Sequence, residues 1–111
     1  MAILITGGSG LIGSHVIMEL VKERKEDKVV IYDVAQPTHP FTLEHLGKEV
    51  EYVEANALDM GRLAETVKKY NVDGIIHAAA WINYAFINKN PMMAYYNNVL
   101  SMLNVLEVAR I

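Results

Sequence analysis

Four glycines occur within seven positions near the start of the chain, in the stretch ILITGGSGLIGSH at residues 3–15. An apolar run precedes them and apolar residues at helical spacing follow, so the pattern predicts a strand that turns sharply into a helix. The first amide groups of such a helix lack intrahelical partners and lie at the positive end of the helix dipole. Glycine removes side chains that would keep an anion away from those amides. The stretch therefore predicts a site for a pyrophosphate group.

The glycines fit two registers of a dinucleotide-binding loop, Gly8-x-Gly10-x-x-Gly13 and Gly7-x-x-Gly10-x-x-Gly13. Neither register is specific by itself, because a glycine-rich turn between a strand and a helix also occurs without a ligand. The chain contains no G-x-x-x-x-G-K-[ST] sequence, which excludes a nucleoside-triphosphate P-loop at this position.

Asp33 is the second element that the loop requires. It follows the loop by about 20 positions, the spacing at which an acidic side chain accepts hydrogen bonds from the ribose of a dinucleotide. A carboxylate there repels the 2′-phosphate of NADP, and Val34, Ala35 and Gln36 offer no cation to offset that repulsion. Asp33 therefore favours NAD over NADP, the alternative being a turn residue without a ligand.

Short apolar runs alternate with segments of helical period along the rest of the chain. Strands are predicted at Ala2–Thr6, Val29–Tyr32, Glu49–Val53 and Gly74–Ala80. The segment from Ala35 to Lys48 is the least regular.

Three helices are predicted between and after these strands. The first opens at Gly13 and carries an apolar face of Ile12, Val16 and Leu20, joined by Ile17 and Val21. Asp59 caps the second helix, and Asn71 stops it. The third runs from about Met92 to the end of the chain, with Val99, Leu103 and Leu106, joined by Met102 and Val105, as its apolar positions.

This alternation predicts an α/β fold over residues 1–111, a Rossmann-like parallel sheet in the order 3-2-1-4 with helices on both faces. The chain is expected to end after the fourth strand–helix unit. In that order strands 1 and 4 are neighbours where the winding reverses, so a crevice opens beside the glycine loop.

Composition excludes several other classes of function. The net charge is −3 and the basic residues are scattered, so the chain has no electrostatic footprint for nucleic acid or for an anionic membrane. It has no cysteine, and His15, His39 and His45 show no metal-ligand spacing, so we expect no metal site. A cytoplasmic location is the default expectation.

Four sequences together resemble a known family: TGGSGLIGSHV, the YD that closes the second strand, HAAA after the fourth strand, and YYNNVLSMLNVLEVAR on the last helix. They are similar to the N-terminal half of the extended short-chain dehydrogenases, and most similar to the NAD-dependent epimerase/dehydratase family. The resemblance covers the whole chain. It implies NAD as the cofactor and, for a longer parent enzyme, a nucleotide sugar as the substrate.

The resemblance also implies the cofactor contacts. The pyrophosphate is expected at Gly7, Gly10 and Gly13, with the backbone of Leu11 and Ile12, and the ribose at Asp33. The small residues Ala78, Ala79 and Ala80 are expected beside the pyrophosphate and the nicotinamide ribose, with Trp81 and Ile82 on the same lip.

Two stretches depart from the family pattern. Ala55, Asn56 and Ala57 replace the usual Gly-Asp-apolar sequence beside the adenine, where Asn56 still offers an amide. On the last helix the usual Asn-x-x-Gly-Thr is replaced by bulkier residues, and either Asn97 or Asn98 is expected to face the cofactor; the alternative is that both face water.

The catalytic residues of the family are missing. No tyrosine of the chain is followed four positions later by lysine, the spacing that places both side chains on one helix face for proton transfer. His77 is interpreted as a packed, hydrogen-bonded residue rather than a base. We therefore assign no catalytic residue, and expect an inactive N-terminal part of a longer enzyme that self-associates through the unpaired edge of the fourth strand.

Two alternatives remain open. The chain could be a dinucleotide-sensing module without enzymatic activity, or a Rossmann-type half that binds FAD or another nucleotide.

Overall fold

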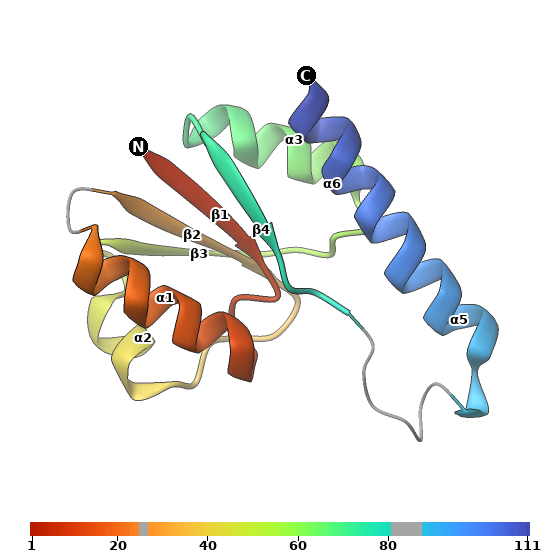
Figure 1. The fold of residues 1–111 in the computed structure, drawn as a ribbon, viewed down its shortest axis with the longest axis horizontal. Helices are drawn as coiled ribbons and strands as arrows, with labels where there is room; N and C mark the ends of the chain where they lie inside the picture. Colours follow the sequence, from red (N-terminus) through yellow and green to blue (C-terminus); the bar gives the residue numbers. More distant parts are fainter. Residues whose placement is uncertain (25–26, 81–87) are drawn as a thin grey trace.

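A four-stranded parallel sheet forms the centre of the chain in the computed structural model, which describes residues 1–24, 27–80 and 88–111 (Figure 1). The strands are β1 (Ala2–Thr6), β2 (Lys28–Asp33), β3 (Val50–Glu54) and β4 (Gly74–His77). Their order is β3-β2-β1-β4, and every pair is parallel. The predicted fold class and strand order are confirmed.

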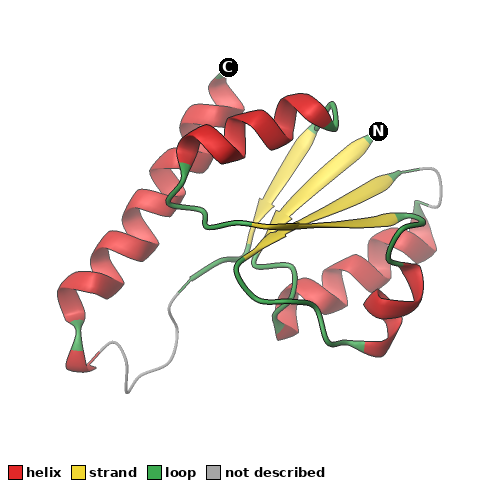
Figure 2. Ribbon diagram, turned by 180° about the vertical axis from the view of Figure 1, so that it is seen from behind, coloured by secondary structure: helices red, strands yellow, loops and turns green. Residues whose placement is uncertain are grey.

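Helices cover both faces of this sheet (Figure 2). On one face lie α1 (Leu11–Glu23) and α2 (Pro40–His45), and on the other lie α3 (Met60–Lys69) and α6 (Ser101–Arg110). A short helix α5 (Pro91–Tyr95) and a π-helical turn η1 (Tyr96–Leu100) lead into α6. The helical segment made of α5, η1 and α6 begins at Pro91, close to the predicted start of the last helix, but the π-helical turn was not predicted.

Two apolar clusters hold the layers together, one on each face of the sheet. Because side chains alternate along a strand, Ile3 and Ile5 of β1 pack toward α1, while Leu4 packs toward α3 and α6. All five residues of β1 are buried. The predicted strand with both faces covered is therefore present, and it fixes where the glycine loop begins.

The ends of α3 follow the predicted signals. The Asp59 carboxylate accepts a hydrogen bond from the backbone N–H of Arg62 at 3.0 Å, which satisfies one of the free amides of the first turn. Asn71 takes the left-handed conformation, with φ of 52°, directly after Tyr70 at the end of the helix.

The segment from Ala35 to Lys48 is more regular than predicted, because it contains α2. Pro40 occupies the first turn of that helix, where a missing N–H costs nothing, and the His39 ring accepts a hydrogen bond from the N–H of Phe41. The proline that suggested irregularity is in fact a helix start signal.

The predicted core face of α1 is wrong in part. The helix begins at Leu11 rather than Gly13, and its fully buried residues are Gly13, Ser14, Ile17 and Val21. Ile12 is 67% exposed, and Val16 and Leu20 are only partly buried. All three residues line one partly exposed flank of α1.

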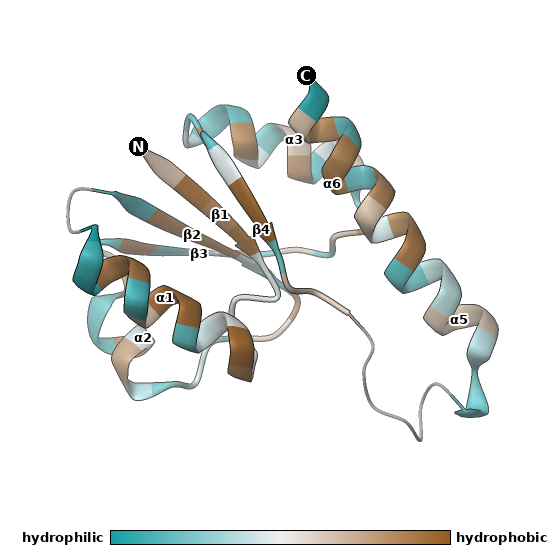
Figure 3. Ribbon diagram, in the orientation of Figure 1, coloured by the Kyte–Doolittle hydropathy of each residue, from teal (hydrophilic) through white to brown (hydrophobic). Residues whose placement is uncertain are grey.

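The same difference occurs on α6. Its buried residues are Ser101, Val105 and Val108, so Val105 is buried as predicted, whereas the predicted apolar positions Val99, Met102, Leu103 and Leu106 are exposed. Figure 3 shows brown, apolar residues along both α1 and α6 as well as in the strands. Apolar spacing identifies a helix, but it does not say which of two apolar sides the neighbouring elements cover.

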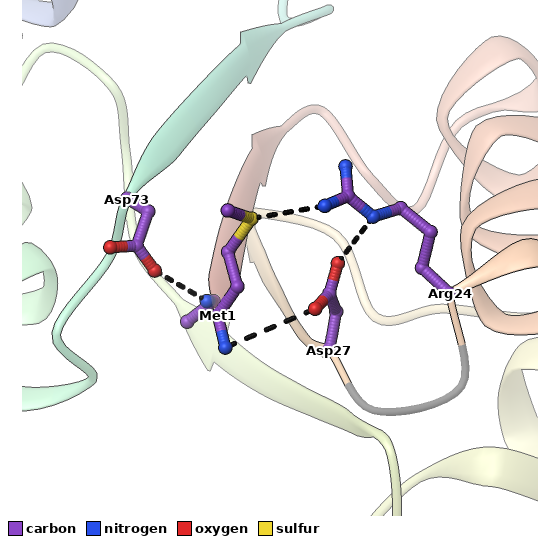
Figure 4. Close-up of polar contacts among 5 residues, drawn as sticks. Met1, Arg24, Asp27 and Asp73 are labelled. Carbon is purple, nitrogen blue, oxygen red and sulfur yellow. Dashed lines mark hydrogen bonds and ion pairs between the residues drawn. The ribbon is translucent and has the colours of Figure 1, made fainter.

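The amino ends of the strands are tied together by acidic side chains (Figure 4). Asp73 accepts a hydrogen bond from the N–H of Ala2 at 2.9 Å, and Arg24 pairs with Asp27 at 2.7 Å. The amino group of Met1 lies 3.9 Å from Asp27. These contacts lie at the amino ends of the strands, opposite to the glycine loop, so they stabilise the fold without occupying the crevice.

In the ranges that the structure describes, no helix has the length and apolar character that crossing a membrane requires.

Candidate dinucleotide-binding site

The glycine loop joins the carboxyl end of β1 to α1 through a turn that two backbone hydrogen bonds hold. The N–H of Gly10 donates to the carbonyl of Gly7 at 3.1 Å, and the N–H of Ser14 donates to the carbonyl of Gly10 at 2.9 Å. Gly7 has φ of 71°, the left-handed conformation that side chains rarely adopt. The strand can therefore reverse into the helix within a few residues.

Two glycines allow backbone segments to approach each other. A β-carbon on Gly7 would lie 2.7 Å from the backbone nitrogen of Ala79, and one on Gly13 would lie 2.5 Å from the carbonyl oxygen of Gly7. Both contacts are too short for any side chain. The loop thus packs against the chain after β4 on one side and against α1 on the other.

Gly10 is different, because a β-carbon there would meet its nearest neighbour only at 3.4 Å. Its lack of a side chain leaves open space above the first turn of α1. The amides of Leu11 and Ile12 precede the first intrahelical bond, and the first turn contains no acidic residue. The positive end of the helix dipole therefore faces this space without a neutralising charge.

Asp33 lies at the carboxyl end of β2, and two backbone amides fix its carboxylate. One oxygen accepts a hydrogen bond from the N–H of Ser9 at 3.0 Å, and the other accepts one from the N–H of Ala35 at 3.1 Å. The hydroxyl of Ser9 also donates to the carbonyl of Ala35 at 2.7 Å. Each carboxylate oxygen can accept a further hydrogen bond. The sequence analysis missed Ser9, which links the loop to β2.

The side of the site next to β3 is built on Tyr32. Its hydroxyl donates to the carbonyls of Asn56 at 3.0 Å and Asp59 at 3.3 Å. Burial is the main cause that raises the Tyr32 pKa to about 12, with the nearby Asp59 carboxylate as the second cause. The side-chain oxygen of Asn56 accepts from the N–H of Leu58, so its NH₂ group is the part that can bind a ligand.

Asn104 of α6 holds the same turn from the other side. Its amide donates to the carbonyls of Ala57 at 3.0 Å and Leu58 at 3.1 Å. Nothing in the local sequence pattern indicates this contact, because the two partners are far apart in the chain.

β4 ends at His77, so the predicted extension of the strand to Ala80 is wrong. The side-chain oxygen of Thr6 accepts hydrogen bonds from the N–H groups of Ala78 at 3.1 Å and Ala79 at 3.3 Å. Ala79 thereby leaves the strand pairing and crosses over Gly7.

These elements surround one crevice, with a volume of about 550 Å³, at the carboxyl ends of the strands. The predicted residues that line it are Gly7, Gly10, Leu11, Ile12, Gly13, Asp33, Asn56, Ala57, Ala78, Ala79, Ala80 and Asn97. Tyr32, Val34 and Ala55 line it as well, although we did not predict them as site residues.

Asn98 is the predicted residue that does not line the crevice; its carbonyl instead accepts a hydrogen bond from Ser101 at 3.2 Å. Of the two alternatives on the last helix, the structure therefore brings Asn97 to the crevice. Trp81 and Ile82 lie outside the described residues.

A second groove, of about 640 Å³, follows the uncovered flank of α1 along Leu11, Ile12, Val16 and Leu20. Its other lining residues are His15, Glu19, Glu23 and Arg24, and the two carboxylates would repel a diphosphate there. No group of three potential metal-ligating side chains occurs among the residues that the structure describes.

The crevice fits a dinucleotide in the types of group that it presents. Gly10 leaves space beside the first turn of α1, the amides of that helix end are open to an anion, and the Asp33 carboxylate is held at the neighbouring strand. The described residues that line the crevice include no lysine or arginine, so backbone amides rather than cationic side chains would bind a pyrophosphate.

Comparison with known proteins agrees with this geometry. Residues 3–111 match the model of the NAD dependent epimerase/dehydratase family. A UDP-glucose 4-epimerase from Haemophilus influenzae is 34% identical over 111 residues, which are 96% of this chain and 32% of that protein. The chain thus spans about a third of the length of that relative.

Solved structures give the same result. A UDP-glucose-4-epimerase from Stenotrophomonas maltophila, with bound NAD and formylated UDP-arabinopyranose, superimposes with a TM-score of 0.84 at 27% identity. The match covers 99% of this chain and 33% of that one. An L-threonine dehydrogenase from Clostridium difficile has a TM-score of 0.81 at 31% identity, covering 97% of this chain and 32% of that one. The chain belongs to the NAD dependent epimerase/dehydratase family.

Proposed function

We propose that the chain binds NAD in the crevice at the carboxyl ends of β1, β2 and β4. The observation that carries the proposal is that the open amide end of α1 and the fixed carboxylate of Asp33 line the same crevice. A pyrophosphate and a ribose are the neighbouring groups of a dinucleotide that suit these two partners.

Each part of the crevice has its own role in this proposal. The amides of Leu11 and Ile12 hold the pyrophosphate, and Asp33 accepts hydrogen bonds from the adenosine ribose. The amide of Asn56 and the methyl group of Ala57 lie beside the adenine, while the residues from Ala78 to Ala80, with Asn97, border the nicotinamide side. NAD, when bound, supplies the group that accepts or returns a hydride.

The proposal includes selectivity for NAD over NADP. The Asp33 carboxylate accepts two backbone hydrogen bonds, which fix its position, and the ribose hydroxyls would donate to its remaining acceptor sites. A 2′-phosphate there would meet this negative charge, and the residues that line the crevice include no cation to compensate it.

The activity of the whole protein is a further part of the proposal. We propose that residues 1–111 are the N-terminal portion of a dinucleotide-binding domain in a longer epimerase or dehydratase that acts on a nucleotide sugar. Support comes from the H. influenzae and S. maltophila relatives, named as UDP-glucose 4-epimerases, of which the chain covers about a third. The chain carries no Tyr-x-x-x-Lys pair, so the catalytic residues would come from another part of that protein.

Two other functions fit the same fold. A sensing module without enzymatic activity would bind NAD equally well, and residues of the parent gene beyond Ile111 with no Tyr-x-x-x-Lys pair would favour it. A site for FAD would differ in affinity rather than in architecture. A cytoplasmic location stays a prediction.

Calorimetric titration of the chain with NAD, NADP and FAD tests the proposal. We expect saturable binding of NAD with one site per chain and weaker binding of NADP and FAD. Tighter binding of FAD would favour the alternative nucleotide, and no binding of any of the three would contradict the assignment.

Self-association also stays a prediction. In the described part of the chain β4 pairs with β1 alone, and α1 and α6 carry exposed apolar residues such as Ile12 and Leu106. Sedimentation velocity over a range of concentrations checks this. We expect a dimer that the substitutions Ile12→Glu and Leu106→Glu dissociate, whereas a monomer at every concentration would refute the prediction.

A further inference from the structure

His77 lies at the end of β4 between two buried hydroxyl groups that come from different elements. Its Nδ1 atom is 2.6 Å from the hydroxyl oxygen of Thr6 in β1, and its Nε2 atom is 3.4 Å from that of Ser101 in α6. Both Thr6 and Ser101 are completely buried. His77 does not line the crevice, so it would not touch a bound dinucleotide.

The hydrogen bonds of Ser101 and Thr6 together indicate which nitrogen of His77 carries the proton. The Ser101 hydroxyl donates to the carbonyl of Asn98, so its oxygen accepts from His77 Nε2–H. The Thr6 hydroxyl oxygen accepts from the N–H of Ala79 and shares that of Ala78 with the Thr6 backbone carbonyl, which lies 3.0 Å from the same nitrogen; its O–H then donates to His77 Nδ1. This pattern fits the neutral tautomer with the proton on Nε2.

The same inventory fixes the direction of the remaining bonds. His77 Nε2–H donates to the Ser101 oxygen, and the Ser101 hydroxyl donates to the carbonyl of Asn98 at 3.2 Å. Asn98 belongs to η1, the π-helical turn that also carries Asn97. π-helical turns within helices are frequent at functional sites. One chain of hydrogen bonds thus runs from η1 through His77 to Thr6.

Thr6 stands directly below the floor of the crevice. The two amides that it accepts belong to Ala78 and Ala79, and Ala79 is the residue that packs on Gly7. The Thr6 hydroxyl therefore helps to hold the floor against the glycine loop, together with the Thr6 carbonyl, which accepts from the N–H of Ala78 at 3.0 Å. An acceptor at His77 Nδ1 keeps that hydroxyl turned so that its oxygen can accept from Ala79.

We propose that His77 is a positioning residue, which as the neutral Nε2–H tautomer links η1 to the floor of the crevice and so sets the affinity for NAD without contacting it. This inference rests on the proposed NAD binding. It assigns to His77 a role that requires its two nitrogens to act differently, one as acceptor and one as donor.

Protonation of His77 would disrupt this arrangement. A proton on Nδ1 would point at the Thr6 hydroxyl oxygen, which already accepts hydrogen bonds from the amides of Ala78 and Ala79. In the described residues the polar side chains that face the ring are the Thr6 hydroxyl from β1 and the Ser101 hydroxyl from α6, so no charge there compensates an imidazolium. Burial lowers the pKa of His77 below its ordinary value of 6.5.

The sign of the pH effect follows. Because the neutral ring is favoured in the folded state, its contribution to stability is complete above pH 6.5 and is lost as the pH falls toward the lowered pKa. NAD affinity is expected to fall only at still lower pH, where His77 of the folded chain itself takes up a proton and the floor loses its support.

Long-range proton–nitrogen NMR correlation on the histidine-labelled chain tests the tautomer without any ligand. We expect His77 to have its proton on Nε2 and to stay neutral at a pH where exposed histidines are charged. His15 is an internal control, because its Nδ1 lies 2.9 Å from the carbonyl of Leu11 and must carry a proton there. A proton on Nδ1 of His77 near neutral pH would overturn the inference.

Three substitutions test the link to the cofactor. His77→Phe keeps the ring shape and removes both nitrogens, so NAD affinity should fall about tenfold. His77→Asn retains an acceptor at the position of Nδ1, so affinity should stay within about threefold of the original and lose its dependence on pH. Ser101→Ala removes the far end of the chain of bonds and should weaken NAD by about threefold.

Thr42→Val is a matched control, since Thr42 is also completely buried but lies in α2, away from the crevice. It should leave NAD affinity unchanged. Folded His77→Phe that binds NAD as tightly as the original chain would overturn the inference. Absence of NAD binding by the original chain would contradict the proposed function instead, and the tautomer measurement would still decide the arrangement at His77.

Discussion

Gly7 and Ala79 lie closer together than any side chain would allow. A β-carbon on Gly7 would be 2.7 Å from the nitrogen of Ala79 and 2.8 Å from its Cα atom. The contact joins the end of β1 to the chain after β4, at the point where the two neighbouring strands leave the sheet. The floor of the crevice exists because residue 7 has no side chain.

Gly7→Ala should therefore lower the free energy of unfolding by about 3 kcal/mol, the sum of left-handed strain and displaced backbone. Gly47→Ala is the matched control, because Gly47 has φ of 81° but has no atom within 4 Å of a built β-carbon. It should cost about 1 kcal/mol, from strain alone. Urea unfolding of both variants measures the difference, and equal losses would contradict the close approach.

Gly10→Asp should separate folding from binding. The φ of −80° at Gly10 and the 3.4 Å contact distance accommodate a side chain, and aspartate at this position can cap α1. Stability should stay the same or rise by about 0.5 kcal/mol, while the added carboxylate repels the pyrophosphate and abolishes NAD binding. Calorimetry combined with thermal unfolding checks both effects. NAD binding that survives in this variant would place the pyrophosphate elsewhere.

Asp33→Asn should change which dinucleotide binds. We expect NAD affinity to fall about tenfold, because a charged acceptor of the ribose hydroxyls is replaced by a neutral one, and the preference over NADP to shrink. Asp73→Asn is a suitable control, since Asp73 also accepts a backbone hydrogen bond but lies at the amino ends of the strands, away from the crevice. It should affect stability and leave the ratio of NAD to NADP affinity unchanged.

The raised pKa of Tyr32 predicts that the chain loses stability in alkali. Its pKa is raised to about 12, because burial and the Asp59 carboxylate disfavour the phenolate. The folded state thus holds this proton more tightly than the unfolded state. The contribution of protonated Tyr32 to the free energy of unfolding is complete below pH 10.0, the ordinary pKa of tyrosine, and is lost as the pH rises toward 12.

Tyr32→Phe should remove that dependence, and should lower stability at neutral pH by about 1 kcal/mol through loss of the bonds to Asn56 and Asp59. Urea unfolding on either side of pH 10.0 measures both effects. Tyr95→Phe is the control at an exposed tyrosine and should change neither. An alkaline slope that persists in Tyr32→Phe would show that another group causes it.

The parts of the fold and of the site that were predictable from sequence depend on local pattern. The apolar run of β1, the glycines after it and the aspartate that ends β2 are each legible within a few residues, and parallel crossovers then fix the strand order. This was sufficient to bring Gly10 and Asp33 to one crevice, whereas Asn97 was named, together with Asn98, only from the family resemblance.

The contacts that sequence analysis missed join residues far apart in the chain. Ser9 holds Asp33, Asn104 holds the turn at Ala57, and Thr6 meets His77. No periodicity reports such pairs, because each depends on how the helices sit on the sheet. The uncovered sides of α1 and α6 were misassigned for the same reason, since spacing reveals an apolar face but not its neighbour.

Titration of NAD into the nitrogen-15-labelled chain, followed by the backbone amide signals, tests the central claim most directly. We predict saturable shifts that are largest at the amides of Leu11, Ile12 and Gly13 and at Ser9, whose N–H bonds to Asp33. Residues at the amino ends of the strands, such as Ala2 and Asp73, should not move. Absence of saturable shifts, or shifts centred on the aliphatic groove along Val16 and Leu20, would contradict it.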